Sequence, residues 1–151
     1  MSEQENIKIV RQLFDDLNSH DLDAGDRLMS NNVMTETPGS QGPMDKARNR
    51  LYEKQFIDAF PDLHFDVRDV IAQGDKVSVT WRVKGTHKGP LLSPKGDTLP
   101  ATNKKIDLPG CTIYQISRDK VVHQEIYWDM VTLLTQLGVP VELSQMSRSQ
   151  R

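Results

Sequence analysis

The sequence has few of the features that mark secreted, membrane-bound or nucleic-acid-binding proteins. It holds one cysteine, Cys111, which excludes an internal disulfide bond and any metal site built from several cysteines. Its apolar runs are only a few residues long, so no segment is expected to cross a bilayer. The 19 Lys and Arg residues are balanced by 21 Asp and Glu residues, and this balance does not favour binding to a nucleic-acid backbone.

Several motifs of known chemistry are also absent. The chain contains no HExxH zinc motif, no GxGxxG or P-loop for nucleotides, and no GxSxG elbow of a hydrolase. Its four histidines lack the spacing of zinc ligands, so we expect no metal and no cofactor. The start, MSEQENIKIV, is acidic and polar, unlike a signal peptide, which predicts a cytoplasmic protein with no membrane contact.

The length of 151 residues suits a single domain with its own hydrophobic core. Residues 1–140 are expected to form this domain, and the polar residues 141–151 a flexible tail. In the first 60 residues apolar side chains recur every three or four positions, which predicts a helix over residues 4–18 and another that ends before Pro61. Between them, Asp21 can cap a short helix, because its carboxylate accepts a free backbone N–H.

The later part of the chain has the two-residue period of strands. The alternation is clearest over Val77–Val83, and strands are also predicted over residues 106–116 and 121–128. Pro109-Gly110 indicates a bulge or an edge position in the first of those two strands. The proline-rich segment of residues 89–102 is expected to be a long loop.

The remaining elements complete the predicted architecture. A short strand is expected over residues 33–37, and Asp129 is expected to cap a last helix that ends at Gly138. Helices gathered before strands are typical of the α+β class. The sequence therefore predicts three N-terminal helices packed on one face of a curved antiparallel sheet, followed by a short C-terminal helix.

Four short motifs occur in an order that resembles a known family. They are N-x-x-D-x-D at residues 18–23, AFPDL at residues 59–63, GTHxG at residues 85–89, and WD followed by LL and QLG at residues 128–138. Over about residues 5–140 the chain is similar to the SnoaL-like polyketide cyclases of the nuclear transport factor two-like superfamily. This resemblance implies a cone-shaped α+β barrel whose sheet and helices enclose an apolar pocket for a small molecule.

The same resemblance implies a chemistry. The cyclases close a ring of an anthraquinone-type polyketide by an intramolecular aldol reaction that needs no metal. Such a reaction requires a base that removes a proton next to a carbonyl, and donors that stabilise the enolate. The family's acid/base Asp lies three residues before the Asp of the WD motif, where this sequence has Ile126, which cannot transfer a proton. Glu125 is adjacent, but strand alternation points it to the opposite face.

Two polar residues are the candidates for replacing the missing Asp. Glu36 lies near the end of the predicted first strand and is either a pocket carboxylate with a raised pKa or a solvated residue at the strand end. His87 follows the alternating face of Val77–Val83 and is expected on the side of Trp81, either as a polar pocket group or as a residue that fixes the next loop. The hypothesis is that Glu36 and His87 act as catalytic residues in one pocket.

Large side chains at helical and strand spacing are the candidate pocket walls, with ordinary core packing as the alternative. Trp128 shares its predicted strand face with Ile126 and Gln124, and the residues between them face outward. The predicted ligand-binding residues are Trp81, Trp128, Ile126, Gln124, Tyr52 and Phe56.

Three functions remain open. The first is a cyclase- or isomerase-type enzyme that acts on an apolar carbonyl compound by metal-free acid/base chemistry. The second is a small-ligand-binding module that kept the pocket and lost the acid, which the isoleucine at position 126 favours. The third is an interaction protein that uses the outer face of the sheet. The expected partners are a small apolar or aromatic ligand and a second copy of the chain in a homodimer.

Overall fold

The structure, a computed structural model, describes residues 2–93 and 96–140; the predicted tail, residues 141–151, lies outside the described residues. The helices are α1 (Glu3–Asn18), α2 (Leu22–Arg27), α3 (Lys46–Ala59) and α4 (Met130–Gln136). The strands are β1 (Met29–Glu36), β2 (His64–Gln73), β3 (Lys76–Thr86), β4 (Leu91–Leu92), β5 (Thr98–Leu99), β6 (Lys105–Ser117) and β7 (Lys120–Trp128). This order confirms the α+β class.

The predicted helix boundaries follow from local capping. The Asp21 carboxylate accepts a hydrogen bond from the backbone N–H of Ala24 at 3.1 Å and so begins α2. Asp129 begins α4 in the same way, since its carboxylate accepts from the backbone N–H groups of Val131 and Thr132. Within the described residues, none of the helices has the length and apolar character needed to span a membrane.

The main sheet has five strands in the order β1-β7-β6-β3-β2. The contacts among β2, β3, β6 and β7 are antiparallel, as predicted. The prediction was wrong for the first strand, because β1 pairs in parallel with β7 and places Thr35 beside Gln124 and Glu36 beside Glu125. The two-residue period identifies a strand but carries no information about its partner.

One local prediction needs correction, and for another the structure selects one of its two alternatives. Residues 89–102 are not a plain loop, because they contain the β4–β5 hairpin. Pro109-Gly110 makes no bulge against β3, where the register runs without a shift. Pairing between β6 and β7 begins only at Gly110, so at Pro109 strand β6 has a neighbour on one side. The residue without an N–H thus occupies a local edge.

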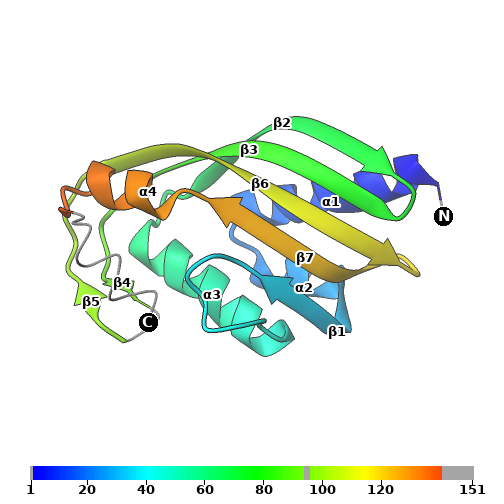
Figure 1. The fold of residues 1–151 in the computed structure, drawn as a ribbon, viewed down its shortest axis with the longest axis horizontal. Helices are drawn as coiled ribbons and strands as arrows, with labels where there is room; N and C mark the ends of the chain where they lie inside the picture. Colours follow the sequence, from blue (N-terminus) through cyan, green and yellow to red (C-terminus); the bar gives the residue numbers. More distant parts are fainter. Residues whose placement is uncertain (1, 94–95, 141–151) are drawn as a thin grey trace.

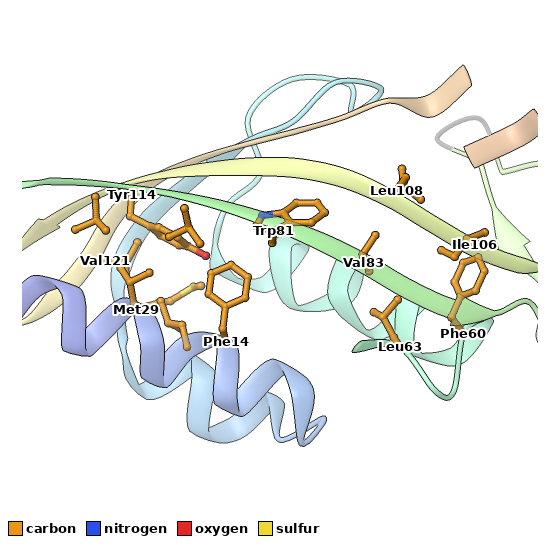
Figure 2. Packing of buried hydrophobic residues seen from close by; sticks show 14 of the residues in the cluster. Phe14, Met29, Phe60, Leu63, Trp81, Val83, Ile106, Leu108, Tyr114 and Val121 are labelled. Carbon is orange, nitrogen blue, oxygen red and sulfur yellow. The ribbon is translucent and has the colours of Figure 1, made fainter. Parts of the chain in front are cut away.

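Helices α1, α2 and α3 cover one face of the curved sheet, and the hydrophobic core lies between these two layers (Figure 1). Figure 2 shows Phe14 rising from α1 towards the sheet residue Tyr114, while Phe60 meets Ile106 at the opposite end. The Phe14 and Tyr114 rings meet edge to face, with their centroids 6.3 Å apart. Phe14, Tyr114 and Ile106 also line the site described next.

Candidate functional site

An apolar cavity of about 110 Å³, here named the inner cavity, lies between the concave face of the sheet and helices α1 to α3. Strand alternation placed Ile126 on this face and Glu125 on the other, and the structure agrees, because Ile126 lines the cavity and Glu125 does not. All the side chains predicted as pocket walls line it: Trp81, Trp128, Ile126, Gln124, Tyr52 and Phe56.

The inner cavity also contains a carboxyl group that the sequence analysis missed, that of Glu53 on α3. Burial raises the pKa of Glu53 to about 7, and a hydrogen bond from Asn49 opposes this rise. Such a group is partly protonated and partly ionised at neutral pH. It can therefore both accept and return a proton, which is the requirement for general acid/base catalysis.

A chain of buried amides holds the Glu53 carboxylate in place. The side-chain Nδ2 of Asn49 donates to Glu53 Oε1 at 2.9 Å. Asn49 Oδ1 in turn accepts from Gln124 Nε2 at 3.2 Å, and the same Gln124 nitrogen donates to Thr35 Oγ1 at 2.7 Å. Thr35, Asn49 and Gln124 are all buried. Because Gln124 occupies the Asn49 oxygen, the N–H side of the Asn49 amide is directed to the carboxylate.

Two hydroxyl groups from the sheet, those of Tyr114 and Thr112, line the same cavity. Burial raises the pKa of the Tyr114 hydroxyl, and the charge of Glu53 raises it further, so Tyr114 stays protonated and within electrostatic range of Glu53. Trp81 Nε1 donates to Thr112 Oγ1 at 3.0 Å, which orients both side chains at the cavity wall. A ketone oxygen in this space would meet hydroxyl donors on the sheet side and a carboxylate on the helix side.

The sequence did contain a signal for Glu53. Asn49, Tyr52, Glu53 and Phe56 are spaced as i, i+3, i+4 and i+7, which places all of them on one face of a helix. A carboxylate within an apolar helical stripe is a candidate for a perturbed pKa. The neighbouring Leu51 does not belong to this face, since its side chain is 55% exposed.

The structure places Glu36 outside the inner cavity, which corrects the prediction of a pocket carboxylate. Buried Thr35 takes the inward position of β1, and the Glu36 side chain is 52% exposed on the outer face. There Glu36 lies 3.4 Å from His123 Nε2, while Glu125 lies 3.8 Å from Nδ1 of the same ring. One imidazole thus lies between two carboxylates, a cluster created by the unpredicted parallel pairing of β1 with β7.

His87 is fully buried but does not line the inner cavity, so the structure does not bring Glu36 and His87 together. Its ring packs on Phe60 with centroids 5.3 Å apart. Nδ1 accepts from the backbone N–H of Thr102 at 3.2 Å, and burial lowers the pKa of the imidazole. The His87 backbone bonds to Asn103 and Lys104. These contacts match the alternative role of fixing the loop after β3.

The sequence profile of the SnoaL-like polyketide cyclases matches residues 8–137. The chain belongs to this family. Curated proteins gave no match to it. The family assignment confirms the resemblance carried by the four motifs, which all lie within the matched residues except for Gly138, the last residue of the fourth motif.

Solved structures of SnoaL-like and related proteins share the fold of this SnoaL-like chain. A candidate SnoaL-like polyketide cyclase from Jannaschia sp. CCS1 is 22% identical, with a TM-score of 0.81 and coverage of 92% of this chain and 95% of that chain. AclR, a candidate hydroxylase from Streptomyces galilaeus, is 20% identical, with a TM-score of 0.81 and coverage of 99% and 92%. IdmH, a candidate polyketide cyclase from Streptomyces antibioticus, is 23% identical, with a TM-score of 0.76 and coverage of 89% and 99%.

Proposed function

We propose that this SnoaL-like protein is a metal-free enzyme of the cyclase or isomerase type, with Glu53 as its acid/base group. The observation that carries the proposal is a carboxyl of pKa about 7 in an apolar cavity, held by the buried amide of Asn49. The substrate class is an apolar compound with a carbonyl group. Glu53 takes the role for which the sequence analysis had suggested Glu36 and His87.

The proposed step is removal of a proton from the carbon next to the carbonyl. The Glu53 carboxylate accepts the proton, and the electrons of the C–H bond form the carbon–carbon double bond of an enolate. The carbonyl oxygen takes up the negative charge, and the Tyr114 hydroxyl stabilises it by donating a hydrogen bond. Return of the proton to another carbon gives isomerisation, whereas attack of the enolate on a second carbonyl of the same molecule closes a ring.

Deuterium exchange tests this step without knowledge of the natural substrate. Phenylacetone has one aromatic ring and an acidic CH₂ next to its ketone, so incorporation of deuterium from D₂O can be followed by NMR. The protein is expected to accelerate the exchange, with a rate that rises with pH to a plateau above about pH 7 as Glu53 ionises. Glu53→Gln should lower the catalysed rate by about 10²–10⁴-fold.

Glu36→Gln is the matched control, because it makes the same chemical change at an exposed carboxylate outside the inner cavity. Its exchange rate should equal that of the unmodified protein. Equal rates for Glu53→Gln and the unmodified protein would contradict the proposed role. If phenylacetone binds but no variant exchanges deuterium, the second candidate, a binding module, is favoured, as the isoleucine at position 126 in the cavity wall already suggests.

We also propose a homodimer that forms through the outer face of the sheet. This face exposes large apolar side chains, with Tyr127 at 47% and Ile71 at 66%. Light scattering is expected to give twice the mass of the chain, and a monomer at high concentration would contradict the proposal. A cytoplasmic location stays a prediction from the sequence.

A further inference from the structure

A second hollow, here named the outer groove, lies beside the inner cavity and has a volume of about 460 Å³. Residues 38–44, helix α3, the β4–β5 hairpin and α4 form its walls. The groove is lined by two large apolar side chains that are exposed to solvent. These are Leu51, which is 55% exposed, and Leu92, which is 43% exposed. At one end the 38–44 loop closes on α4, since a Cβ atom on Gly39 would lie only 2.5 Å from Met130 Cε.

The two hollows are neighbours separated by a wall of side chains that line both, here named the partition: Tyr52, Phe56, Trp128 and Leu133. Trp128 Nε1 donates a hydrogen bond to the Tyr52 hydroxyl at 3.2 Å, which joins β7 to α3 across the partition. The ring of Phe56 stands edge-on to Trp128 with centroids 5.9 Å apart. One hydrogen bond and a set of ring contacts therefore hold together the side chains that lie between the two hollows.

The volume of the inner cavity is too small for a complete ligand of ordinary dimensions. A protein cavity of roughly 150 Å³ accommodates one benzene ring. The inner cavity, at about 110 Å³, is no larger. Small-molecule sites are usually about 300–1,000 Å³, and the outer groove, at about 460 Å³, falls in this range. A ligand larger than one ring that reaches Glu53 must therefore leave most of its volume in the outer groove.

The side chains that line the outer groove indicate the chemistry of the part of the ligand that lies there. Hydroxyl and amide side chains, among them Ser40, Gln55 and Thr98, accompany the leucines. Arg48 and Asp97 both line the groove and carry opposite charges, so their sum gives no preference for an anion or a cation. A neutral body that carries several oxygen atoms fits such a lining.

We propose that the protein binds an elongated, neutral, oxygen-bearing ligand in two parts. An apolar end of about one ring enters the inner cavity, and the larger remainder lies in the outer groove. The Tyr52–Trp128 hydrogen bond acts as the gate between them. This inference rests on the proposed function in that it uses the same inner cavity, and it adds the shape of the substrate and the route by which it enters.

Two ketones of different length test the division. Phenylacetone is little larger than the single ring that the inner cavity can hold, and 4-(benzyloxy)phenylacetone adds a second ring on an ether oxygen. Their binding is measured by NMR titration of the full chain and of Leu51→Asp and Leu92→Asp, which change exposed positions of the groove. Loss of an apolar contact is expected to weaken binding of the long ketone about tenfold, with phenylacetone affinity changed less than twofold. Val131→Asp, on α4 outside the groove and exposed to nearly the same extent as Leu92 (42% against 43%), is the control and should bind both ketones normally.

Equal affinity of both ketones for all variants would overturn the two-part site, as would an equal loss for the two ketones. Neither result would affect the assignment of Glu53, because that rests on deuterium exchange at the CH₂ of phenylacetone, which tests Glu53 whether or not the outer groove binds part of the ligand. Conversely, normal deuterium exchange by Glu53→Gln would contradict the proposed chemistry. If Leu51→Asp and Leu92→Asp still weaken binding of the long ketone alone, the two-part site would remain supported.

Tyr52→Phe tests the gate, because it removes the hydroxyl and keeps the ring. Loss of this hydrogen bond is expected to raise both the association and the dissociation rate of phenylacetone by about 2–10-fold, with the affinity changed less than twofold. NMR line shapes or exchange spectroscopy give these rates. Unchanged rates, or a change in affinity through only one of them, would overturn the gate.

Discussion

Helices α1 and α3 cover the same face of the sheet, but they are held against it in different ways. Helix α1 contributes the buried apolar residues Val10, Leu13 and Phe14 to the core. Helix α3 is of similar length, yet only Asn49 and Ala59 are buried in it. Both helices line the inner cavity, but α1 contributes apolar side chains to it, whereas α3 also contributes the carboxyl group of Glu53. The difference shows how one small domain combines a packed core with a hollow site.

Polar contacts replace packing along α3. The Arg50 guanidinium forms ion pairs of 2.7 Å with both Asp23 and Asp26, which joins α3 to α2. Lys46 Nζ donates to the backbone carbonyl of Met29 at 3.1 Å, and Asn49 is bound to Gln124 of the sheet. Surface ion pairs contribute little to stability, so the buried amide pair is the stronger attachment. The comparison can be tested by changing each kind of contact.

The largest expected effect is in the packed helix. Leu13→Ala should lower the free energy of unfolding by about 2–5 kcal/mol, since it removes buried methyl groups and leaves a void. Leu51→Ala on the outward side of α3 should change it by less than about 0.5 kcal/mol. Urea denaturation of both variants measures the difference. Similar values for the two would show that α3 is packed as firmly as α1.

The second effect depends on pH and concerns Glu53. Its pKa is raised from 4.5 in the free side chain to about 7 in the folded protein, so the folded state retains a proton that the unfolded chain has lost. Stability must therefore fall as the pH rises from about 4.5 to about 7, by about 3 kcal/mol in total. Glu53→Gln cannot ionise, so it should lose this decline and be the more stable protein at pH 8. Denaturation curves at pH 5 and pH 8 test this, and parallel pH profiles for the two proteins would contradict the raised pKa.

A third variant removes the amide that joins α3 to the sheet. Gln124→Leu leaves Thr35 and the Asn49 oxygen buried without their donor, which should cost about 1–3 kcal/mol in unfolding free energy. It also frees the Asn49 amide to rotate away from Glu53, so the midpoint of the deuterium-exchange pH profile should move upward. Loss of stability with an unchanged midpoint would mean that Gln124 has no part in positioning the carboxylate.

The smallest effect is expected at α4, which is short and held by its cap. Asp129→Ala removes the acceptor for the backbone N–H groups of Val131 and Thr132. The melting temperature should fall by about 2–4 °C, with binding of phenylacetone nearly unchanged, because Asp129 does not line the inner cavity. Calorimetry and the NMR titration give the two values. An unchanged melting temperature together with lost binding would assign Asp129 to the site instead of the cap.

Much of the fold could be predicted because its determinants are local. Asp21 and Asp129 act as caps through neighbouring backbone groups, and the alternation along β7 was enough to separate Ile126 from Glu125. The parallel partner of β1 could not be predicted in this way, since pairing Glu36 with Glu125 depends on residues far apart in the chain. The error about Glu36 is a separate one, because its outward direction follows from alternation with the buried residues Val33 and Thr35.

The candidate site likewise has a part that could be predicted from local spacing and a part that could not. Its apolar walls follow from the spacing of large side chains, but the acid within them depends on burial, which spacing alone does not measure. Glu53 is an ordinary helix residue in sequence, and only the surrounding cavity and Asn49 give its pKa the value that catalysis requires. His87 shows the converse, because a histidine at a promising position is engaged by Thr102 and the loop after β3.

The position of the tryptophans has a practical consequence. The chain has only two, Trp81 and Trp128, and both line the inner cavity. Trp81 lies so close over Gly110 that a Cβ atom there would be 2.1 Å from its ring, which leaves the indole little freedom to reorient. The intrinsic indole emission of this protein therefore arises entirely from the walls of the site, so that an unlabelled sample can report optically on whatever enters it.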